Sequence, residues 1–214
     1  MRRPLPAISG AAYENPVLRH LAPRVDWDVE AFYQFGSFGT PAGDGEIAAW
    51  SVASSVGHTF ESAPFHPRLG LRANVISGDD DPGDPDLQTF NALFPKGKYF
   101  GEIGLLGPYN LINVHPALTL KLTDDVVVDL ACVLFWRHRA RDGIYNNAGY
   151  PIRSDAVTSD RFIGTQLEVA LTYAFSREIE LSAAYGVSFP GRSIQKTGSR
   201  ENTHFVGIEF SYRF

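Results

Sequence analysis

The chain has one cysteine, one methionine and no long apolar run. A single cysteine, Cys132, cannot form a disulfide within the chain, so cysteine content says little about the cellular compartment. No stretch approaches the roughly 18 apolar residues of a transmembrane helix, which excludes a helical membrane protein. The N-terminus does not resemble a signal peptide, because Arg2 and Arg3 are followed by prolines and small residues. A membrane β-barrel is compatible with these absences, since only alternate residues of its strands face lipid.

Positive charge is in the minority. The sequence has 19 Lys and Arg residues against 24 Asp and Glu residues, a formal net charge of -5. A general nucleic-acid binder is usually basic, so we expect no nucleic-acid partner. The chain is 44% hydrophobic and 13% aromatic, which argues against disorder. Its 214 residues are enough for one sizeable folded domain.

The C-terminal segment has a period of two. Polar or small residues separate its apolar and aromatic ones, which are Val206, Ile208, Phe210, Tyr212 and Phe214. This period predicts a strand with one apolar face. A final strand that ends in Phe resembles the signal by which outer-membrane barrels are recognised for insertion. The last strand of a soluble sandwich also alternates, so this segment alone leaves both alternatives open.

Seven further segments alternate in the same way, and no long segment has the 3.6-residue period of a helix. The eight predicted strands are 24–38, 46–60, 67–77, 110–122, 126–138, 161–175, 178–189 and 204–214. Pro116 interrupts the fourth, where we expect a bulge or a local break. The sequence therefore predicts an all-β fold, an antiparallel meander of about eight strands.

The connections between these strands alternate in length. Short turns follow the second, fourth and sixth strands, and long polar loops follow the third, fifth and seventh, at 78–109, 139–160 and 190–202. Outer-membrane barrels have this pattern, with short periplasmic turns and long extracellular loops. A soluble sandwich gives no reason for it. We therefore predict an irregular segment at 1–23 and part of a transmembrane β-barrel at 24–214.

Several short motifs, in order along the chain from about residue 25 to 214, resemble the alginate-export family of outer-membrane porins. They are VEAFYQFG (29–36), SGDDDPGD (77–84), TF (89–90), LFP (93–95), GKYFG (97–101), NLINVHP (110–116), FWR (135–137) and DGIY (142–145). The resemblance implies a monomeric barrel of about eighteen strands, of which this chain would supply the C-terminal half. Eight strands could also close alone, but so narrow a barrel is filled by side chains and conducts little.

The resemblance also implies a function and a location. Members of this family would lie in the bacterial outer membrane, in contact with lipid and lipopolysaccharide, and pass an acidic polysaccharide such as alginate or another hydrophilic solute. A structural or adhesive barrel without transport is the alternative. No enzyme activity is expected, because the six histidines are scattered and none lies in a nucleophile motif such as G-x-S-x-G.

Strand parity assigns many charged side chains to the inner face, where they would set the selectivity of a pore. The predicted pore-lining residues are Arg68, Arg72, Lys121, Arg137 and Arg213, together with Glu30 and Asp129. Guanidinium groups bind carboxylates bidentately, so a basic lining would attract a polyuronate. The mixture of signs is equally compatible with ion pairs that brace the wall.

An acidic loop at 79–86 is the one candidate cofactor site. Asp79, Asp81 and Asp84 could offer carboxylates to Ca²⁺, a hard cation that prefers oxygen ligands. The spacing lacks the twelve-residue calcium-loop pattern, so a solvated acidic loop is the alternative. We expect no other cofactor.

Overall fold

One antiparallel sheet makes up most of the structure, a computed structural model that describes residues 12–14, 17–21, 24–40, 43–94, 96–153, 158–198 and 200–214. Each long strand pairs with the next long strand along the chain. The long strands are β3 (Val25–Thr40), β4 (Gly43–Thr59), β5 (Arg68–Ile76), β6 (Leu111–Lys121), β7 (Val126–Arg137), β10 (Phe162–Ala174), β11 (Ile179–Pro190) and β12 (Thr203–Tyr212). The predicted all-β meander is therefore confirmed.

Shorter elements complete the fold. Strands β1 (Ala12–Glu14) and β2 (Val17–Leu21) both pair with β3 and extend the sheet to ten strands. They lie within the segment 1–23 that we expected to be irregular, and a sequence of three or five residues is too short to show a period. Strands β8 (Ile144–Tyr145) and β9 (Pro151–Arg153) form a hairpin, and α1 (Arg192–Thr197) precedes β12. In the described part of the chain no helix has the length and apolarity to cross a membrane.

Pro116 interrupts pairing as expected. Its lack of an N–H removes one donor from β6. Pairing between β6 and β7 omits His115 and Pro116 and resumes at Ala117 in the same register, so the effect is a local break without a shift. On the other side, Pro116 still lies opposite Leu71 of β5.

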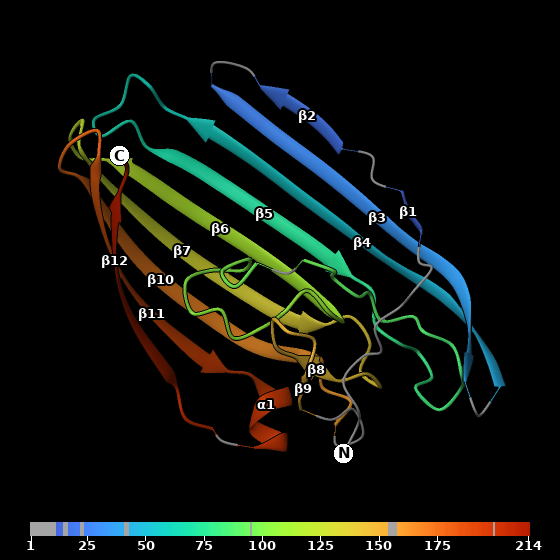
Figure 1. Ribbon diagram of the computed structural model, residues 1–214. Helices are drawn as coiled ribbons and strands as arrows, with labels where there is room; N and C mark the ends of the chain where they lie inside the picture. Colours follow the sequence, from blue (N-terminus) through green and yellow to red (C-terminus); the bar gives the residue numbers. More distant parts are fainter. Residues whose placement is uncertain are drawn as a thin grey trace.

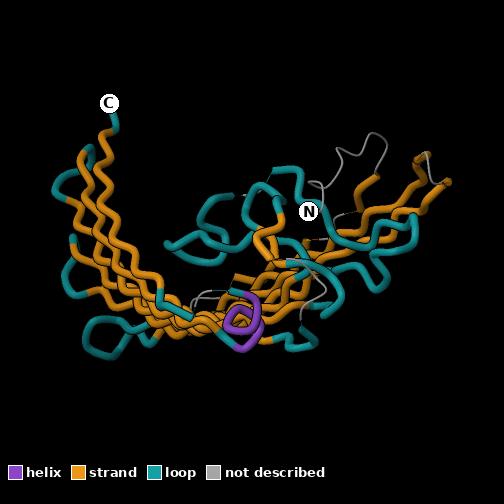
Figure 2. The backbone as a smooth tube through the Cα atoms, turned by 90° about the horizontal axis from the view of Figure 1, so that it is seen from below, coloured by secondary structure: helices purple, strands orange, loops and turns teal. Residues whose placement is uncertain are grey.

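The sheet is curved and open. Figure 1 shows the long strands side by side, and Figure 2 shows them bent into a trough with loops lying on its concave side. One edge of the trough is β12 and the other is β3 with β1 and β2. Strongly twisted sheets of this many strands tend to curl. A curled sheet has a concave face and a convex face.

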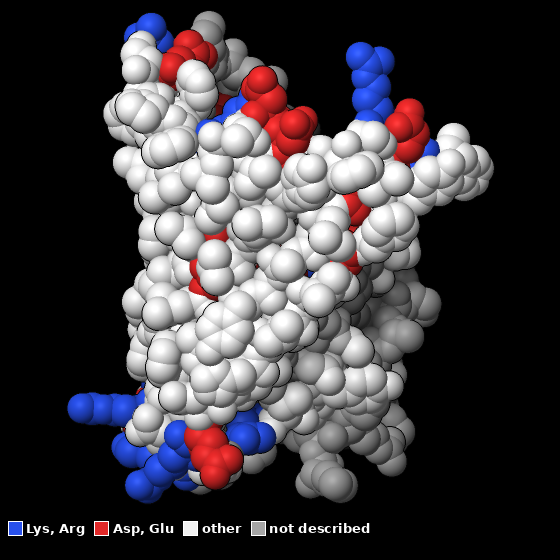
Figure 3. Space-filling view, turned by 90° about the vertical axis from the view of Figure 1, so that its left-hand side faces the viewer, with Lys and Arg blue, Asp and Glu red and all other residues white. Residues whose placement is uncertain are grey.

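The two faces differ in chemistry. Alternate side chains of each strand lie on the concave face and contact the loops. For example, the side-chain amide of Gln34 donates a hydrogen bond to the Asn91 carbonyl at 2.7 Å. The other side chains of each strand lie on the convex face. Many of them are apolar and exposed, among them Leu71, Leu130, Leu167, Leu171, Leu181, Ile208 and Phe210. Figure 3 shows this outer surface as a mostly uncharged band between two charged ends. A band of this kind is what contact with lipid requires.

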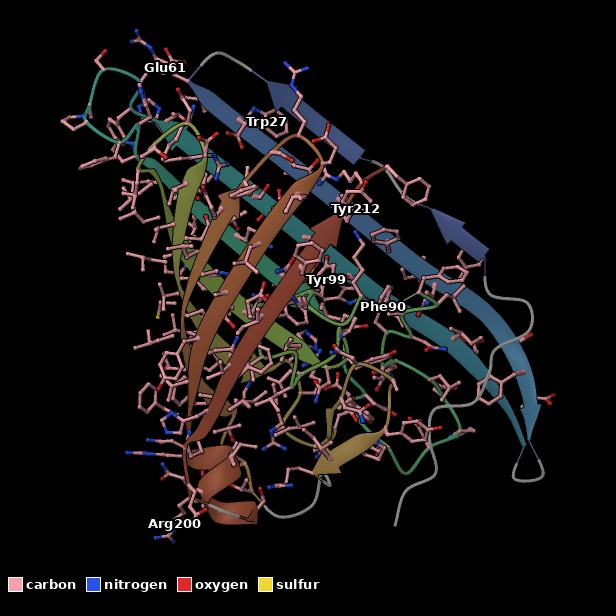
Figure 4. The ribbon with its side chains drawn as sticks, turned by 60° about the vertical axis from the view of Figure 1, so that its left-hand side comes forward. Trp27, Glu61, Phe90, Tyr99, Arg200 and Tyr212 are labelled. Atoms are coloured by element: carbon pink, nitrogen blue, oxygen red, sulfur yellow. The ribbon has the colours of Figure 1, made fainter. Side chains whose placement is uncertain are left out.

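Turns and loops are segregated to opposite ends of the sheet. The C-terminus and the turns at 60–67, 122–125 and 175–178 lie at one end in Figure 1, and α1 and the β8–β9 hairpin lie at the other. Figure 4 places Glu61 at the short-turn end and Arg200 at the long-loop end. One connection departs from strict alternation, because β3 ends at Thr40 and β4 begins at Gly43 at the long-loop end.

An apolar core lies between the sheet and the loops. The first long loop (77–110) contributes Phe90, Phe100 and Leu106, all buried. Phe100 packs edge-on against Phe135 of β7, with ring centroids 6.2 Å apart. The other members come mainly from the sheet and include Ala49, Ile76, Leu111, Val133 and Ile163. Burial of apolar area stabilises this arrangement, so the loop is packed into the trough.

Candidate pore lining on the concave face

A polar chamber of about 370 Å³ lies on the concave face, under the first long loop. The sheet contributes side chains from β3 to β6, and the loop contributes Lys96, Lys98 and Tyr99. The sheet residues that matter most for its chemistry are Asp28, Glu30, Arg72, Asn74, Asn113 and His115. Two of the predicted pore-lining residues, Glu30 and Arg72, therefore meet in one cavity.

Arg72 is an exposed cation on the concave face of the sheet. It lies opposite His115 in the pairing of β5 with β6, and its Nη2 is 3.1 Å from Nδ1 of that ring. Its side chain is exposed, and no ion pair joins it to a carboxylate among the described residues. Its charge is therefore free to interact with a solute.

Amides form a second wall of the chamber. Asn74 Nδ2 donates to Asn113 Oδ1 at 2.7 Å, and both residues are buried. The Nδ2 of Asn113 is also buried, and it has no hydrogen-bond partner in the part of the chain that the structure describes. A buried donor without an acceptor is costly, so a solute or water oxygen would be stabilised there.

Tyr99 covers the chamber from the loop. Burial raises the pKa of its phenol, and the nearby Glu30 carboxylate raises it further, while Arg72 acts in the opposite direction. The hydroxyl is therefore a neutral donor at ordinary pH. Figure 4 shows Tyr99 and Phe90 on the concave side of the sheet.

The two lysines of the loop have different roles. Lys98 lies 2.8 Å from Glu102 and 3.4 Å from Glu209, and the hydrogen bond to Glu102 is the main reason why its pKa is raised. It thereby ties the loop to β12. Lys96 lines the chamber and forms no ion pair with the described residues, so its charge adds to that of Arg72.

Three other predicted pore-lining residues have partners in the wall. Arg68 lies 2.5 Å from Asp26 across β4, and Lys121 lies 2.9 Å from Asp124 at a short turn. The Thr119 hydroxyl donates to Asp129 at 2.5 Å. These contacts brace the wall. A further predicted residue is exposed near the C-terminus: Arg213.

Arg137 lies on the concave face, as predicted, but it does not line an open space. Its side chain is only 1% exposed, because the second long loop (138–161) wraps around it. Its guanidinium donates to the carbonyls of Ala140 at 2.8 Å, Thr158 at 2.6 Å and Asp160 at 2.5 Å. Arg137 therefore holds the loop in place, and we correct its assignment as a residue that contacts solute.

A loop clamp, centred on Asp142 and Asn110, joins the two long loops. Buried Asp142 accepts hydrogen bonds from the Thr89 hydroxyl at 2.6 Å, the Tyr145 hydroxyl at 2.6 Å and the Asp79 N–H at 3.0 Å. Asn110 adopts the left-handed conformation, φ 48°, and its amide donates to carbonyls of the second loop. These residues belong to the motifs recognised in the sequence, but no local pattern revealed their role.

The carboxylates of the acidic loop accept local hydrogen bonds. Asp79, Asp81 and Asp84 each accept a hydrogen bond from a backbone N–H two residues further on. Among the described residues no group of three or more His, Cys, Asp or Glu side chains is placed to hold a metal ion. The calcium site stays a prediction, and in the described loop these carboxylates shape turns, as Asp side chains commonly do.

A curved antiparallel meander with an apolar convex face and a polar concave face is the wall of a porin-type β-barrel. The family model described as alginate export matches residues 8–208, and the chain belongs to this family. No curated protein matches the chain. Among solved structures it is similar to one titled "NanC porin structure in rhombohedral crystal form", with 10% identity and a TM-score of 0.46, covering 94% of this chain and 76% of that chain.

Proposed function

We propose that this chain forms the wall of a channel in the bacterial outer membrane, through which an acidic polysaccharide such as alginate, or a similar hydrophilic solute, diffuses. One observation carries the proposal: Arg72 is exposed in a polar chamber on the concave face with no carboxylate partner among the described residues. Membership of the alginate export family supports it. The convex face would contact lipid, with lipopolysaccharide around the long-loop end, and the complete barrel would be monomeric.

The chamber offers weak contacts of the kind that a channel needs. Arg72 and Lys96 supply positive charge, and Asn113 and Tyr99 supply neutral donors. Carboxylates of a polyuronate could exchange between such groups. Conduction requires binding that is strong enough for entry and weak enough for release, and several moderate sites meet that requirement better than one strong site.

The test is conductance of the complete protein in planar bilayers. Charge reversal by Arg72→Glu with Lys96→Glu should lower anion preference and weaken block by polyuronate. Lys121→Glu is the matched control, because Lys121 is paired with Asp124 at a short turn. The effect should grow as salt is lowered, since the Debye length is about 8 Å at physiological ionic strength. Unchanged reversal potentials at low salt would refute the assignment of these two residues.

A structural or adhesive barrel is the second candidate. It is favoured by the apolar core that packs the first long loop into the trough. Inserted protein that gives no conductance under any voltage would support this candidate against the channel.

A further inference from the structure

A second cavity adjoins the polar chamber. This aromatic cavity of about 450 Å³ is lined by Phe32, Phe90, Leu93, Phe94 and Pro108, among others. It shares three residues with the chamber: Glu30, Lys96 and Tyr99. The two cavities are therefore neighbours, one apolar and one polar, with these three residues between them.

The aromatic cavity exposes apolar side chains on the concave side of the sheet. Phe94 is 92% exposed and Leu93 is 50% exposed, and both belong to the loop that lies on the concave side of the sheet. Lipid explains exposed apolar residues on the convex face but not these. A large exposed apolar patch on a polar surface is typical of a ligand site, since covering it gains free energy.

The polar part offers donors for one anionic group. Arg72 and Lys96 have no carboxylate partner among the described residues, and the buried Nδ2 of Asn113 has no acceptor there. Two acids, Asp28 and Glu30, line the same chamber, but each already has an interaction partner. The unused groups are therefore cations and an amide donor, which together suit a carboxylate.

We propose that the two cavities together bind an aromatic carboxylate. Its ring occupies the aromatic cavity beside Phe90 and Phe94, and its carboxylate lies in the chamber near Arg72 and Asn113. The volume of each cavity, about 370 Å³ and about 450 Å³, falls within the range of small-molecule sites, about 300 to 1,000 Å³. A sugar acid fits less well, because its hydroxyl groups would lack partners against the apolar wall. The inference rests on the proposed function for the route by which this solute enters.

Three probes separate the contributions of ring and charge. Benzoate carries both, benzyl alcohol lacks the charge, and galacturonate lacks the aromatic ring. Binding to the purified full chain in detergent can be measured by saturation-transfer NMR and calorimetry. We expect benzoate to bind at least about tenfold more tightly than the other two, since a charge-assisted hydrogen bond and a ring contact each contribute about that factor.

Variants test the assignment of the residues. Phe94→Ala should weaken benzoate binding about 3- to 10-fold, and Arg72→Gln about 10- to 100-fold. Phe175→Ala is the matched control, because Phe175 is 67% exposed but lies at a short turn. It should leave benzoate binding unchanged.

Several outcomes would overturn the proposal. Equal affinity for galacturonate, or benzoate binding insensitive to Phe94→Ala, would remove the aromatic cavity from the site. A loss of thermal stability in that variant with unchanged binding would identify Phe94 as a packing residue. Binding is measured without a bilayer, so it is separable from transport. If the protein conducts ions but does not bind benzoate, the binding site is refuted and the channel is not. If the protein binds benzoate but does not conduct, the channel is refuted and the binding site is not.

Discussion

The hydroxyl of Thr89 donates a hydrogen bond to the carboxylate of Asp142 at 2.6 Å, and both side chains are buried. The two residues are 53 positions apart and belong to different long loops. The same carboxylate also accepts from Tyr145 and from the backbone of Asp79. One acidic side chain therefore holds together the two loops that cover the concave face.

Asp142→Ala should release these loops. It leaves two hydroxyls and two N–H groups, those of Asp79 and Gly143, without their acceptor. We therefore expect a loss of at least about 3 kcal/mol in the free energy of unfolding. Hydrogen exchange should rise in both loops and not in the strands. Asp84→Asn is the control, because Asp84 is exposed and Asn can accept the same backbone hydrogen bond. Unchanged exchange in Asp142→Ala would mean that the apolar core alone holds the loops.

Replacing Arg137 by lysine should separate bracing from selectivity. Lysine keeps the charge but not the planar fork that reaches several carbonyls, so we expect a loss of about 2 kcal/mol or more in stability. Ion selectivity of the channel should not change. Arg72→Gln should do the reverse, with altered reversal potentials and little change in unfolding. A selectivity change in Arg137→Lys would return that residue to the lining.

Leu171→Arg should impair folding into lipid. Leu171 is 41% exposed on the convex face, where a charge near the bilayer midplane costs about 2 to 4 kcal/mol. Thr172→Arg is the matched control, since the next residue has the opposite parity. The measurement is the free energy of folding into lipid vesicles. Equal effects of the two substitutions would contradict the assignment of the faces.

His138, the first residue after β7, should make stability depend on pH. Its Nδ1 accepts the Gly78 N–H at 3.2 Å, and burial, with Arg139 and Arg161, lowers its pKa from the ordinary 6.5 against the opposing effect of Asp80 and Asp142. A lowered folded-state pKa means that the unfolded chain binds more protons, so this stabilisation is complete above pH 6.5 and is lost as pH falls through the lowered value.

The measurement for His138 is the unfolding midpoint between pH 7.5 and 4.5. Comparison with His138→Asn isolates the contribution of this residue, because the amide oxygen can still accept from Gly78 but does not titrate. The variant should lose less stability on acidification than the original chain. Identical pH profiles would assign the dependence to other groups.

The strands and their faces were readable from local pattern. The exposed residues Leu167, Val169 and Leu171 alternate with polar or small residues, and this period of two predicted a strand with one apolar face. Short turns between such strands leave no topology except pairing of neighbours, so the meander followed as well.

Strands β1 and β2 were not readable in this way. They hold three and five residues, and they exist because the edge of β3 offers hydrogen-bond partners. The same limit applies to the loops. Phe94, Lys96 and Tyr99 lie in a segment without periodicity, and long-range packing of that loop, including Phe100 against Phe135, brings them over the sheet.

Arg72 and Arg137 differ in burial, and the sequence pattern did not predict this difference. Both are arginines on concave-facing positions of long strands, and parity treats them alike. One remains exposed beside His115, while the other is enclosed by a loop whose carbonyls lie up to 23 residues away. Side-chain direction is a local property of a strand, and alternation encodes it. Burial depends on which distant segment packs on top, and that is set by the sum of many long-range contacts.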